Sequence, residues 1–208
     1  TVISPLSIAV LAAIVIYTLY AKRRNVLIGL MILTTTIPNI QRVVVGGLDF
    51  PLARIVIIAA IIRVVLKCEY RFQGHRIDRF MVAYTIATTI AYTVLWGSGS
   101  AFANRLAYAI DFLGAYFIAR ATIRSVEDVK HILRALIICS IPVTIFMLSE
   151  QVLHYNILSV FGGVPETPLL REGRFRAQAA FSHPILAGTF GALLVPISWF
   201  FWRSRERI

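Results

Sequence analysis

The sequence predicts an all-α fold, a polytopic bundle of transmembrane helices, and three observations lead to that class. Of the 208 residues, 58% are hydrophobic and the mean hydropathy is +0.77, whereas ordinary globular domains are about 45–50% apolar. Several apolar runs reach or approach the ~20 residues that a helix needs to cross ~30 Å of hydrocarbon. Most of the basic residues behind the net charge of +11 stand at the ends of those runs, as membrane topology requires.

Seven apolar runs are expected to form the spans. They cover residues 2–20, 26–41, 52–67, 80–97, 104–120, 132–154 and 185–202. The second run is the weakest, because it is short and contains Pro38 near its end. Gly46, Gly47 and Pro51 then interrupt any continuing helix. We therefore expect the segment between the second and third spans to re-enter the bilayer or to lie at its surface.

The positions of lysine and arginine predict how the chain is threaded. Only six of the 21 basic residues fall on one side of the predicted membrane, namely Arg42, Arg54, Arg105, Arg171, Arg174 and Arg176. The other side has Lys22, Arg23, Arg24, Arg63, Lys67, Arg71, Arg76, Arg79, Arg120, Arg124, Lys130, Arg134, Arg203, Arg205 and Arg207. Because cytoplasmic loops retain lysine and arginine, we predict Thr1 outside and Ile208 inside.

One inside segment, residues 124–134, has the pattern of a short amphipathic helix at the membrane surface. Ser125 is suited to cap it, Glu127 and Asp128 follow near its N-terminus, and Lys130 and Arg134 lie towards its end. We expect this helix to act as a topological anchor.

Composition and motifs exclude several classes of protein. No soluble basic face is left for nucleic acid, so no nucleic-acid partner is expected. The sequence lacks Walker A, HExxH, CxxC, GxSxG and DxD patterns, so we expect no metal and no cofactor. Residues 1–208 are expected to form a single transmembrane domain. The first residue is not methionine and the last are RSRERI, which suggests a fragment of a longer protein.

Three arginines stand out because they lie on the side that topology keeps poor in arginine. Arg171, Arg174 and Arg176 precede the span that starts near Pro184. Guanidinium groups bind phosphate through paired hydrogen bonds, and the helix N-terminus would add free amides. The cluster is therefore a candidate diphosphate site, and the alternative is that each arginine reaches towards lipid headgroups. His183 is a candidate catalytic or hydrogen-bonding residue, or it satisfies a neighbouring carbonyl.

Ionisable residues within the apolar runs are further candidates. Asp111 lies near the middle of a predicted span, where a charge is expensive and indicates function by default. Arg105 on the same helix, or an arginine folding inward from another loop, could be its partner; the alternative role of Asp111 is a polar clamp between helices. Glu150 lies four residues before His154, and this pair either faces the same cavity or lies at the interface. Asp111, Glu150 and Arg105 are our candidate cavity residues.

The run GRFRAQAAFSHPILAGTFGALLVP, residues 173–196, resembles the bacterial O-antigen ligase and O-antigen polymerase superfamily, which includes exopolysaccharide polymerases. Arg176, Phe181, His183, Pro184 and Gly188 stand at matching places. YFIARATIRSVEDVKHIL and GGLDFPLARIVIIAAII resemble the middle and an early part of the family. The matching regions thus correspond to its N-terminal and middle portions, and family members have around ten to twelve spans.

The resemblance implies an inverting membrane glycosyltransferase in the bacterial inner membrane. Such an enzyme moves a glycan from an undecaprenyl-diphosphate-linked donor to an acceptor sugar on the periplasmic face, without a metal. The resemblance makes Arg176 the first choice for diphosphate contact, Arg174 the second and Arg171 the third. The expected partners are that donor, a glycan or lipid acceptor, and membrane lipids. Two alternatives are a non-enzymatic transporter or flippase for an anionic lipid or solute, and a structural subunit whose basic loop binds anionic lipid.

Overall fold

The protein is mainly helical. The structure, a computed structural model, describes residues 3–45, 48–70 and 74–204, and most of these residues are helical. The described residues form seven α helices, which are α1 (Pro5–Tyr20), α2 (Val26–Thr36), α3 (Leu52–Leu66), α4 (Arg76–Trp96), α5 (Gly99–Thr122), α6 (Val126–Leu153) and α7 (Pro184–Ser204). Two 3-10 helices, η1 (Arg23–Asn25) and η2 (Ile157–Phe161), lie between them. The predicted helical class is confirmed, and each α helix contains most of one predicted apolar run.

Two short antiparallel hairpins add to the helices. The first pairs β1 (Arg42–Val45) with β2 (Leu48–Pro51), and the second pairs β3 (Leu169–Arg171) with β4 (Arg174–Arg176). The first occupies the segment predicted to re-enter the membrane or lie at its surface, where a run of β-branched valines favours strand. Gly46 and Gly47, predicted to break the helix there, lie outside the described residues, as do Thr1, Arg71, Arg205, Arg207 and Ile208 from the topology prediction.

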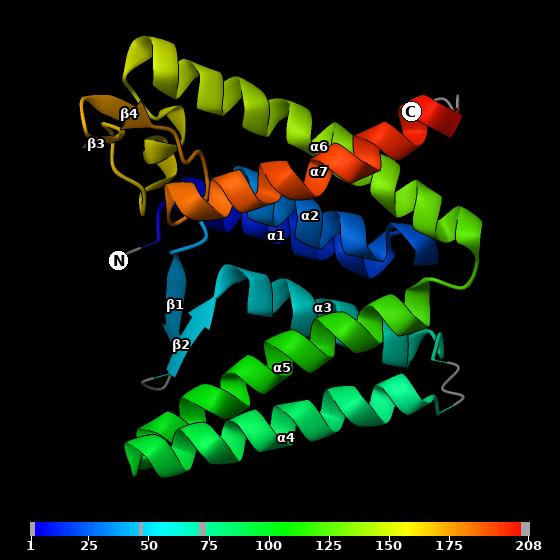
Figure 1. Ribbon diagram of the computed structural model, residues 1–208. Helices are drawn as coiled ribbons and strands as arrows, with labels where there is room; N and C mark the ends of the chain where they lie inside the picture. Colours follow the sequence, from blue (N-terminus) through cyan, green and yellow to red (C-terminus); the bar gives the residue numbers. More distant parts are fainter. Residues whose placement is uncertain (1–2, 46–47, 71–73, 205–208) are drawn as a thin grey trace.

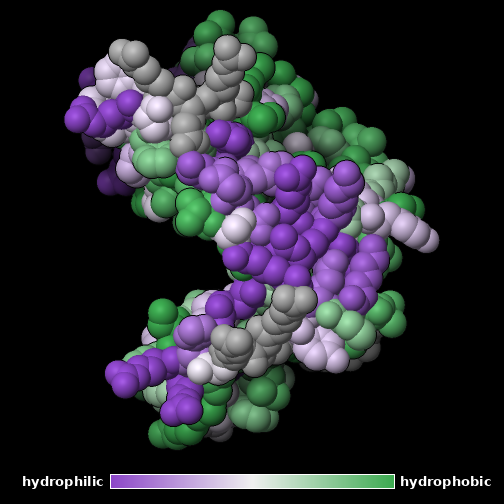
Figure 2. Space-filling model, turned by 90° about the vertical axis from the view of Figure 1, so that its right-hand side faces the viewer, coloured by the Kyte–Doolittle hydropathy of each residue, from purple (hydrophilic) through white to green (hydrophobic). Residues whose placement is uncertain are grey.

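The helices lie alongside one another and alternate in direction (Figure 1). Consequently the four strands lie at one end of the molecule, which we call the strand end. The segments that join α1 to α2 and α5 to α6, together with the end of α3 and the start of α4, lie at the other end, which we call the basic end. The basic end carries exposed Lys22, Arg24, Lys67, Arg76, Arg79, Arg124 and Arg203. Figure 2 looks onto this end and shows hydrophilic residues gathered across its middle.

Local signals explain where the helices begin and end. Ser4, Ser98 and Ser125 each cap a helix by accepting a hydrogen bond from a backbone amide three residues later. α4 begins with a capping box, in which the Asp78 carboxylate accepts from the His75 amide at 2.9 Å. The hydrogen bond from the Asp128 amide to the Ser125 hydroxyl confirms the predicted cap of α6. The predicted separate surface helix is wrong, because residues 126–134 continue without a break into α6.

The core lies where α1, α2 and α3 meet, with α5 packed against α3. On α1 the buried residues Ser7, Leu11, Ile14 and Thr18 form one stripe. Gly29 of α2 lies so close to α1 that an added Cβ would come within 2.4 Å of the Thr18 hydroxyl. α4 is the most peripheral helix and packs chiefly on α5 (Figure 1). Most of its surface is therefore exposed, large apolar side chains included.

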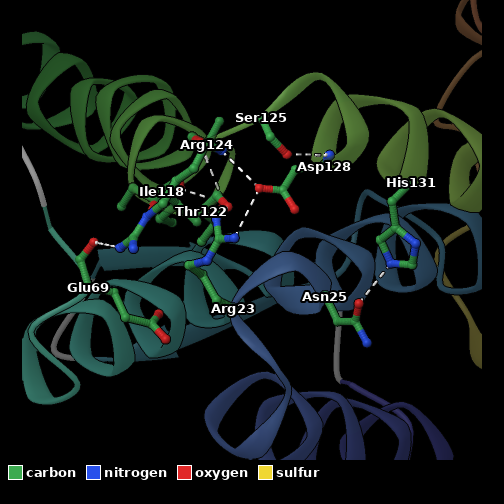
Figure 3. A network of polar contacts seen from close by, with 11 residues as sticks. Arg23, Asn25, Glu69, Ile118, Thr122, Arg124, Ser125, Asp128 and His131 are labelled. Carbon is green, nitrogen blue, oxygen red and sulfur yellow. Dashed lines mark hydrogen bonds and ion pairs between the residues drawn. The ribbon is translucent and has the colours of Figure 1, made fainter.

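Arginines join the loops at the basic end (Figure 3). Arg23 forms an ion pair of 3.0 Å with Asp128 near the start of α6. Arg124 donates from its side chain to the carbonyl of Glu69 at 2.6 Å, and its own amide donates to the Asp128 carboxylate at 3.0 Å. The same network joins Arg23 to the carbonyl of Thr122, and His131 to Asn25. These contacts fix the relative positions of α2, α3, α5 and α6 at this end.

Length and composition distinguish the helices as candidates for crossing a membrane. In the described residues, α6 and α7 are long and apolar enough, and α1 is a shorter apolar helix. α2 has 11 residues, which at ~1.5 Å per residue extend for about 16 Å, roughly half of the hydrocarbon thickness. It ends at Thr36, two residues before Pro38, and so does not reach residue 41 as predicted. Seven crossings therefore stay a prediction.

Candidate anion-binding site

The β3–β4 hairpin presents its three arginines on one face. Glu172 and Gly173 both have positive φ, 54° and 73°, which gives the tight turn that suits a two-residue hairpin. Arg171 stands directly opposite Arg174, and Arg176 lies two residues further along β4. Because directly opposed residues and residues two apart share a face of a β ribbon, all three guanidinium groups lie on the same side.

Buried Glu150 fixes the chain immediately after Arg176. Its side chain belongs to the last turns of α6, is fully buried, and accepts hydrogen bonds from the amides of Gln178 at 2.8 Å and Ala179 at 2.5 Å. The carbonyl of Ala179 in turn accepts from the side chain of Asn156 at 3.1 Å. These bonds hold Ala179 at φ 49°, in the left-handed region that only surrounding contacts stabilise for such a residue.

The end of α6 also holds strand β4 itself. The Gln151 side chain donates to the carbonyl of Phe175 at 2.9 Å. The His154 ring stacks on the Phe175 ring with centroids 4.0 Å apart. Glu150 and His154 are therefore not paired with each other, because one is buried beneath the loop and the other covers β4. Both instead position the residues that flank Arg176.

An open cavity of about 500 Å³ lies between the end of α6 and the beginning of α7. Among the described residues that line it, Arg176 is the only charged one, and the walls are mostly apolar. The lining residues are Thr144, Met147, Leu148, Gln151, Arg176, Ala177, Pro184 and Ile185. Within the described part of the chain, the guanidinium groups of Arg174 and Arg176 make no hydrogen bond or ion pair. Arg171 lies 3.6 Å from Glu172 with both side chains well exposed, an interaction worth little.

His183 caps helix α7. Its Nδ1 accepts a hydrogen bond from the amide of Ile185 at 3.2 Å, and its carbonyl accepts from the amides of Leu186 at 3.0 Å and Ala187 at 3.4 Å. Pro184 has no amide hydrogen to offer. The expectation of free amides at this helix start is therefore wrong, because His183 uses them. His183 is exposed and directly precedes Pro184, which lines the cavity.

Asp111 is paired with Arg54. The guanidinium of Arg54 donates from Nε to Oδ1 at 2.8 Å and from Nη2 to Oδ2 at 2.7 Å, while Nη1 reaches the carbonyl of Asp49 at 2.8 Å. Arg54 lies on α3 and is buried. The proposed partner Arg105 instead lies over the Tyr92 ring, 3.8 Å from its centroid. Asp111 thus joins α3 to α5 as a polar clamp.

The three candidate cavity residues do not meet at one place. Among the described residues, none of Asp111, Glu150 and Arg105 lines the cavity beside Arg176. Glu150 is bonded to the amides of Gln178 and Ala179, and the other two belong to α5. The described residues also contain no group of three or more His, Cys, Asp or Glu side chains suited to hold a metal ion.

The roles of two residues, Gln151 and Arg54, were not identified from the sequence. Gln151, which lines the cavity and holds β4, resembles any polar residue at the end of an apolar run. Arg54 was assigned to the outer surface, although it lies inside the apolar run that starts at Leu52. An arginine there and an aspartate in another run could have been paired, because opposite charges within membrane segments usually neutralise each other.

No family model matches this sequence, and comparison with curated proteins and with solved structures found no significant match.

Proposed function

We propose that the protein crosses a bacterial inner membrane seven times, with the basic end in the cytoplasm. The support is the distribution of apolar surface. Large apolar side chains are exposed along the helices, for example Ile90 and Val94 of α4, Ile145 and Leu148 of α6 and Val195 of α7. Soluble monomers rarely expose contiguous apolar patches of this extent. The exposed basic residues meanwhile concentrate at one end, which agrees with the positive-inside rule.

On this scaffold the proposed activity is glycan transfer from an undecaprenyl-diphosphate-linked donor to an acceptor sugar on the periplasmic side, as in the O-antigen ligase and polymerase superfamily. The single observation that carries the proposal is the position of Arg176. Its guanidinium, with no partner in the described residues, lines an open apolar cavity between two helices. A lipid diphosphate has the matching chemistry, because its chain suits apolar walls and its phosphates suit a guanidinium.

In the proposed reaction the acceptor hydroxyl attacks the anomeric carbon of the donor with inversion. The bond from that carbon to the diphosphate oxygen breaks, the hydroxyl proton is released, and undecaprenyl diphosphate departs. Arg176 and Arg174 would stabilise the negative charge that develops on the departing diphosphate, and this electrostatic term is usually the largest in catalysis. Arg171, on the same face of the hairpin, would extend the positive field.

His183 is proposed as a hydrogen-bond donor. Its Nδ1 already accepts from the Ile185 amide, so the neutral ring carries its proton on Nε2. In that tautomer Nε2 can donate to a phosphate or sugar oxygen but cannot accept a proton. His183 therefore fits the role of a contact in the donor site better than that of a general base.

Transport of an anionic solute is the alternative activity. It would use Asp111 as an ion-carrying group, yet both oxygens of Asp111 are bonded to Arg54. A carboxylate engaged in this way is suited to joining helices. We therefore favour transfer over transport.

The test measures donor binding and transfer in parallel. Binding of undecaprenyl diphosphate to the purified protein in nanodiscs, and glycan transfer by membranes containing it, are compared between wild type, Arg176→Ala and Arg174→Ala. We expect Arg176→Ala to weaken binding about tenfold or more, because a hydrogen bond to a charged group contributes about 1.5–3 kcal/mol. Transfer should fall by about 10²–10³-fold, as for loss of one charge-stabilising donor.

Arg42→Ala is the matched control. Arg42 belongs to the other hairpin at the same end, is exposed, and pairs with Asp49 at 3.0 Å. Its loss should change neither readout. Full binding and full transfer by both Arg176→Ala and Arg174→Ala would show that the diphosphate role is wrong.

A further inference from the structure

A second open cavity, of about 570 Å³, lies between α2 and α6 on the half of the molecule nearer the basic end. We call it the α2–α6 groove. From α2 it is lined by Ile28, Ile32, Thr35 and Thr36, and from α6 by His131, Arg134, Ala135, Ile138, Cys139 and Pro142. The two threonine hydroxyls donate to backbone carbonyls of their own helix. The groove wall is therefore largely apolar except where His131 and Arg134 stand.

Both polar residues are held in place at the basic end of the groove. The Arg134 guanidinium carbon lies 5.4 Å from the centre of the Phe201 ring on α7, which orients its plane. His131 and Asn25 share a hydrogen bond of 2.8 Å between Nε2 and Oδ1. Because an amide oxygen only accepts, Nε2 is the donor. Nδ1 of His131 has no partner among the described residues.

The dimensions of the groove match one leaflet of a bilayer. From His131 to Pro142 it follows α6 for about 16 Å, at ~1.5 Å per residue. This is about half of the ~30 Å hydrocarbon thickness. Its polar end coincides with the basic end, which lies on the cytoplasmic side in the proposed orientation. The groove therefore combines an apolar wall of leaflet length with a cation at headgroup level.

We propose that the α2–α6 groove binds one anionic phospholipid of the cytoplasmic leaflet. An acyl chain lies along Ile28, Ile32 and Ile138, and the phosphate lies at Arg134 with His131 beside it. Basic pockets between transmembrane helices on this side bind anionic headgroups, and guanidinium groups bind phosphate through paired hydrogen bonds. The site rests on the proposed membrane orientation but is independent of glycan transfer at Arg176.

A neighbouring groove provides an internal comparison. The cavity of about 460 Å³ between α3 and α5 is lined by Ile61, Val64, Val65, Tyr70, Phe117 and Ile118. It has a similar volume and an apolar wall, and none of its lining residues in the described part of the chain is charged. It should accept acyl chains without regard to headgroup. Selectivity for an anionic lipid is therefore expected only from the α2–α6 groove.

The experiment titrates the purified chain, in a neutral detergent, with phosphatidylglycerol or with phosphatidylcholine of identical acyl chains, and counts bound lipids by native mass spectrometry. We expect one phosphatidylglycerol to bind at concentrations about tenfold lower than phosphatidylcholine, because both lipids carry the phosphate but the choline cation of the second is repelled by the Arg134 guanidinium. Arg134→Gln should abolish that preference. Ile32→Trp, which fills the groove without changing charge, should abolish the tight binding as well.

Arg24→Gln is the matched control, because Arg24 is exposed at the same end and does not line the groove. It should keep the preference for phosphatidylglycerol. The proposal is overturned if Arg24→Gln and Arg134→Gln lose affinity equally, or if Ile32→Trp binds the lipid as tightly as wild type. The proposal is also overturned if soluble glycerol phosphate displaces the lipid at a concentration similar to that of the lipid. The apolar wall of the groove would then contribute nothing to the free energy of binding.

Two further readouts separate this proposal from the others. Insertion of the chain into phosphatidylcholine nanodiscs tests membrane crossing, and undecaprenyl diphosphate binding tests the Arg176 site. If Arg134→Gln does not fold, as judged by thermal unfolding in detergent, Ile32→Trp and the competition with glycerol phosphate test whether the α2–α6 groove binds the phospholipid.

Discussion

At the basic end Arg63 is 2% exposed, pairs with Glu69 and donates to the carbonyl of Ala21 at 2.6 Å, whereas at the strand end Arg176 lines an open cavity without a partner in the described residues. The same residue type thus serves two purposes. At the basic end, charge that topology already requires is also used to join loops. At the strand end, where topology disfavours arginine, the hairpin arginines add little to the internal contacts. This difference makes the hairpin arginines, rather than those that join loops, the candidates for the diphosphate.

The comparison predicts its largest effect at Arg63. Arg63→Met keeps most of the side-chain volume but leaves the Glu69 carboxylate and the Ala21 carbonyl without their donor. Removing one partner of a buried ion pair typically costs about 3–5 kcal/mol, so we expect a loss of about 3 kcal/mol in the free energy of unfolding. Denaturant titration in mixed micelles measures it. Arg24→Met, an exposed arginine at the same end, should change stability by less than about 0.5 kcal/mol. Equal losses would contradict the assigned roles.

Asp78 gives the basic end a stability that depends on pH. Hydrogen bonds from the Tyr116 hydroxyl, the His75 amide and the Arg120 guanidinium hold the pKa of the Asp78 carboxyl well below its ordinary value of 3.8. A carboxylate with a lowered pKa in the folded state stabilises the protein above its unfolded value. That stabilisation is lost as the pH falls below 3.8. It is therefore fully present at neutral pH.

Asp78→Asn should consequently lower the midpoint of thermal unfolding at pH 7, and the difference from wild type should shrink as the pH is reduced through 4 towards 3. Melting curves in detergent across this range measure it. Glu172→Gln, on the exposed hairpin turn, serves as the control and should show no such convergence. A difference between Asp78→Asn and wild type that persists unchanged at pH 3 would show that the carboxylate charge is not what stabilises this end.

The helices could be predicted because their signals are local. Apolar runs, serine caps and prolines fix the positions of helices such as α1 and α7 without reference to the rest of the chain. The two hairpins could not be predicted in the same way. β3 and β4 are too short for a periodic pattern, and contacts from α6 through Gln151 and His154 hold them. The loop after them depends on Glu150, which is 28 residues away from Gln178 along the sequence.

The candidate residues likewise include some that could be identified from the sequence and some whose contacts could not be predicted. The three hairpin arginines were recognised because each violates a topological rule that the sequence alone reveals. The pairing of Arg54 with Asp111 was not, because the two residues are 57 positions apart and several arginines competed as partners. The sequence shows that a charged residue lies within an apolar run, where burying the charge costs free energy. Only the packing of the helices determines which residue neutralises it.

The smallest expected change in stability is at the hairpin, and it is the sharpest test of the comparison. Arg174→Gln and Arg176→Gln remove guanidinium groups that make no described side-chain bond, so each should change the free energy of unfolding by less than about 0.5 kcal/mol. Binding of undecaprenyl diphosphate should nevertheless weaken in both. A single preparation measured by denaturant titration and by ligand binding gives both numbers. If Arg176→Gln destabilises the fold as much as Arg63→Met, then Arg176 is a structural residue, and the contrast between the two ends fails.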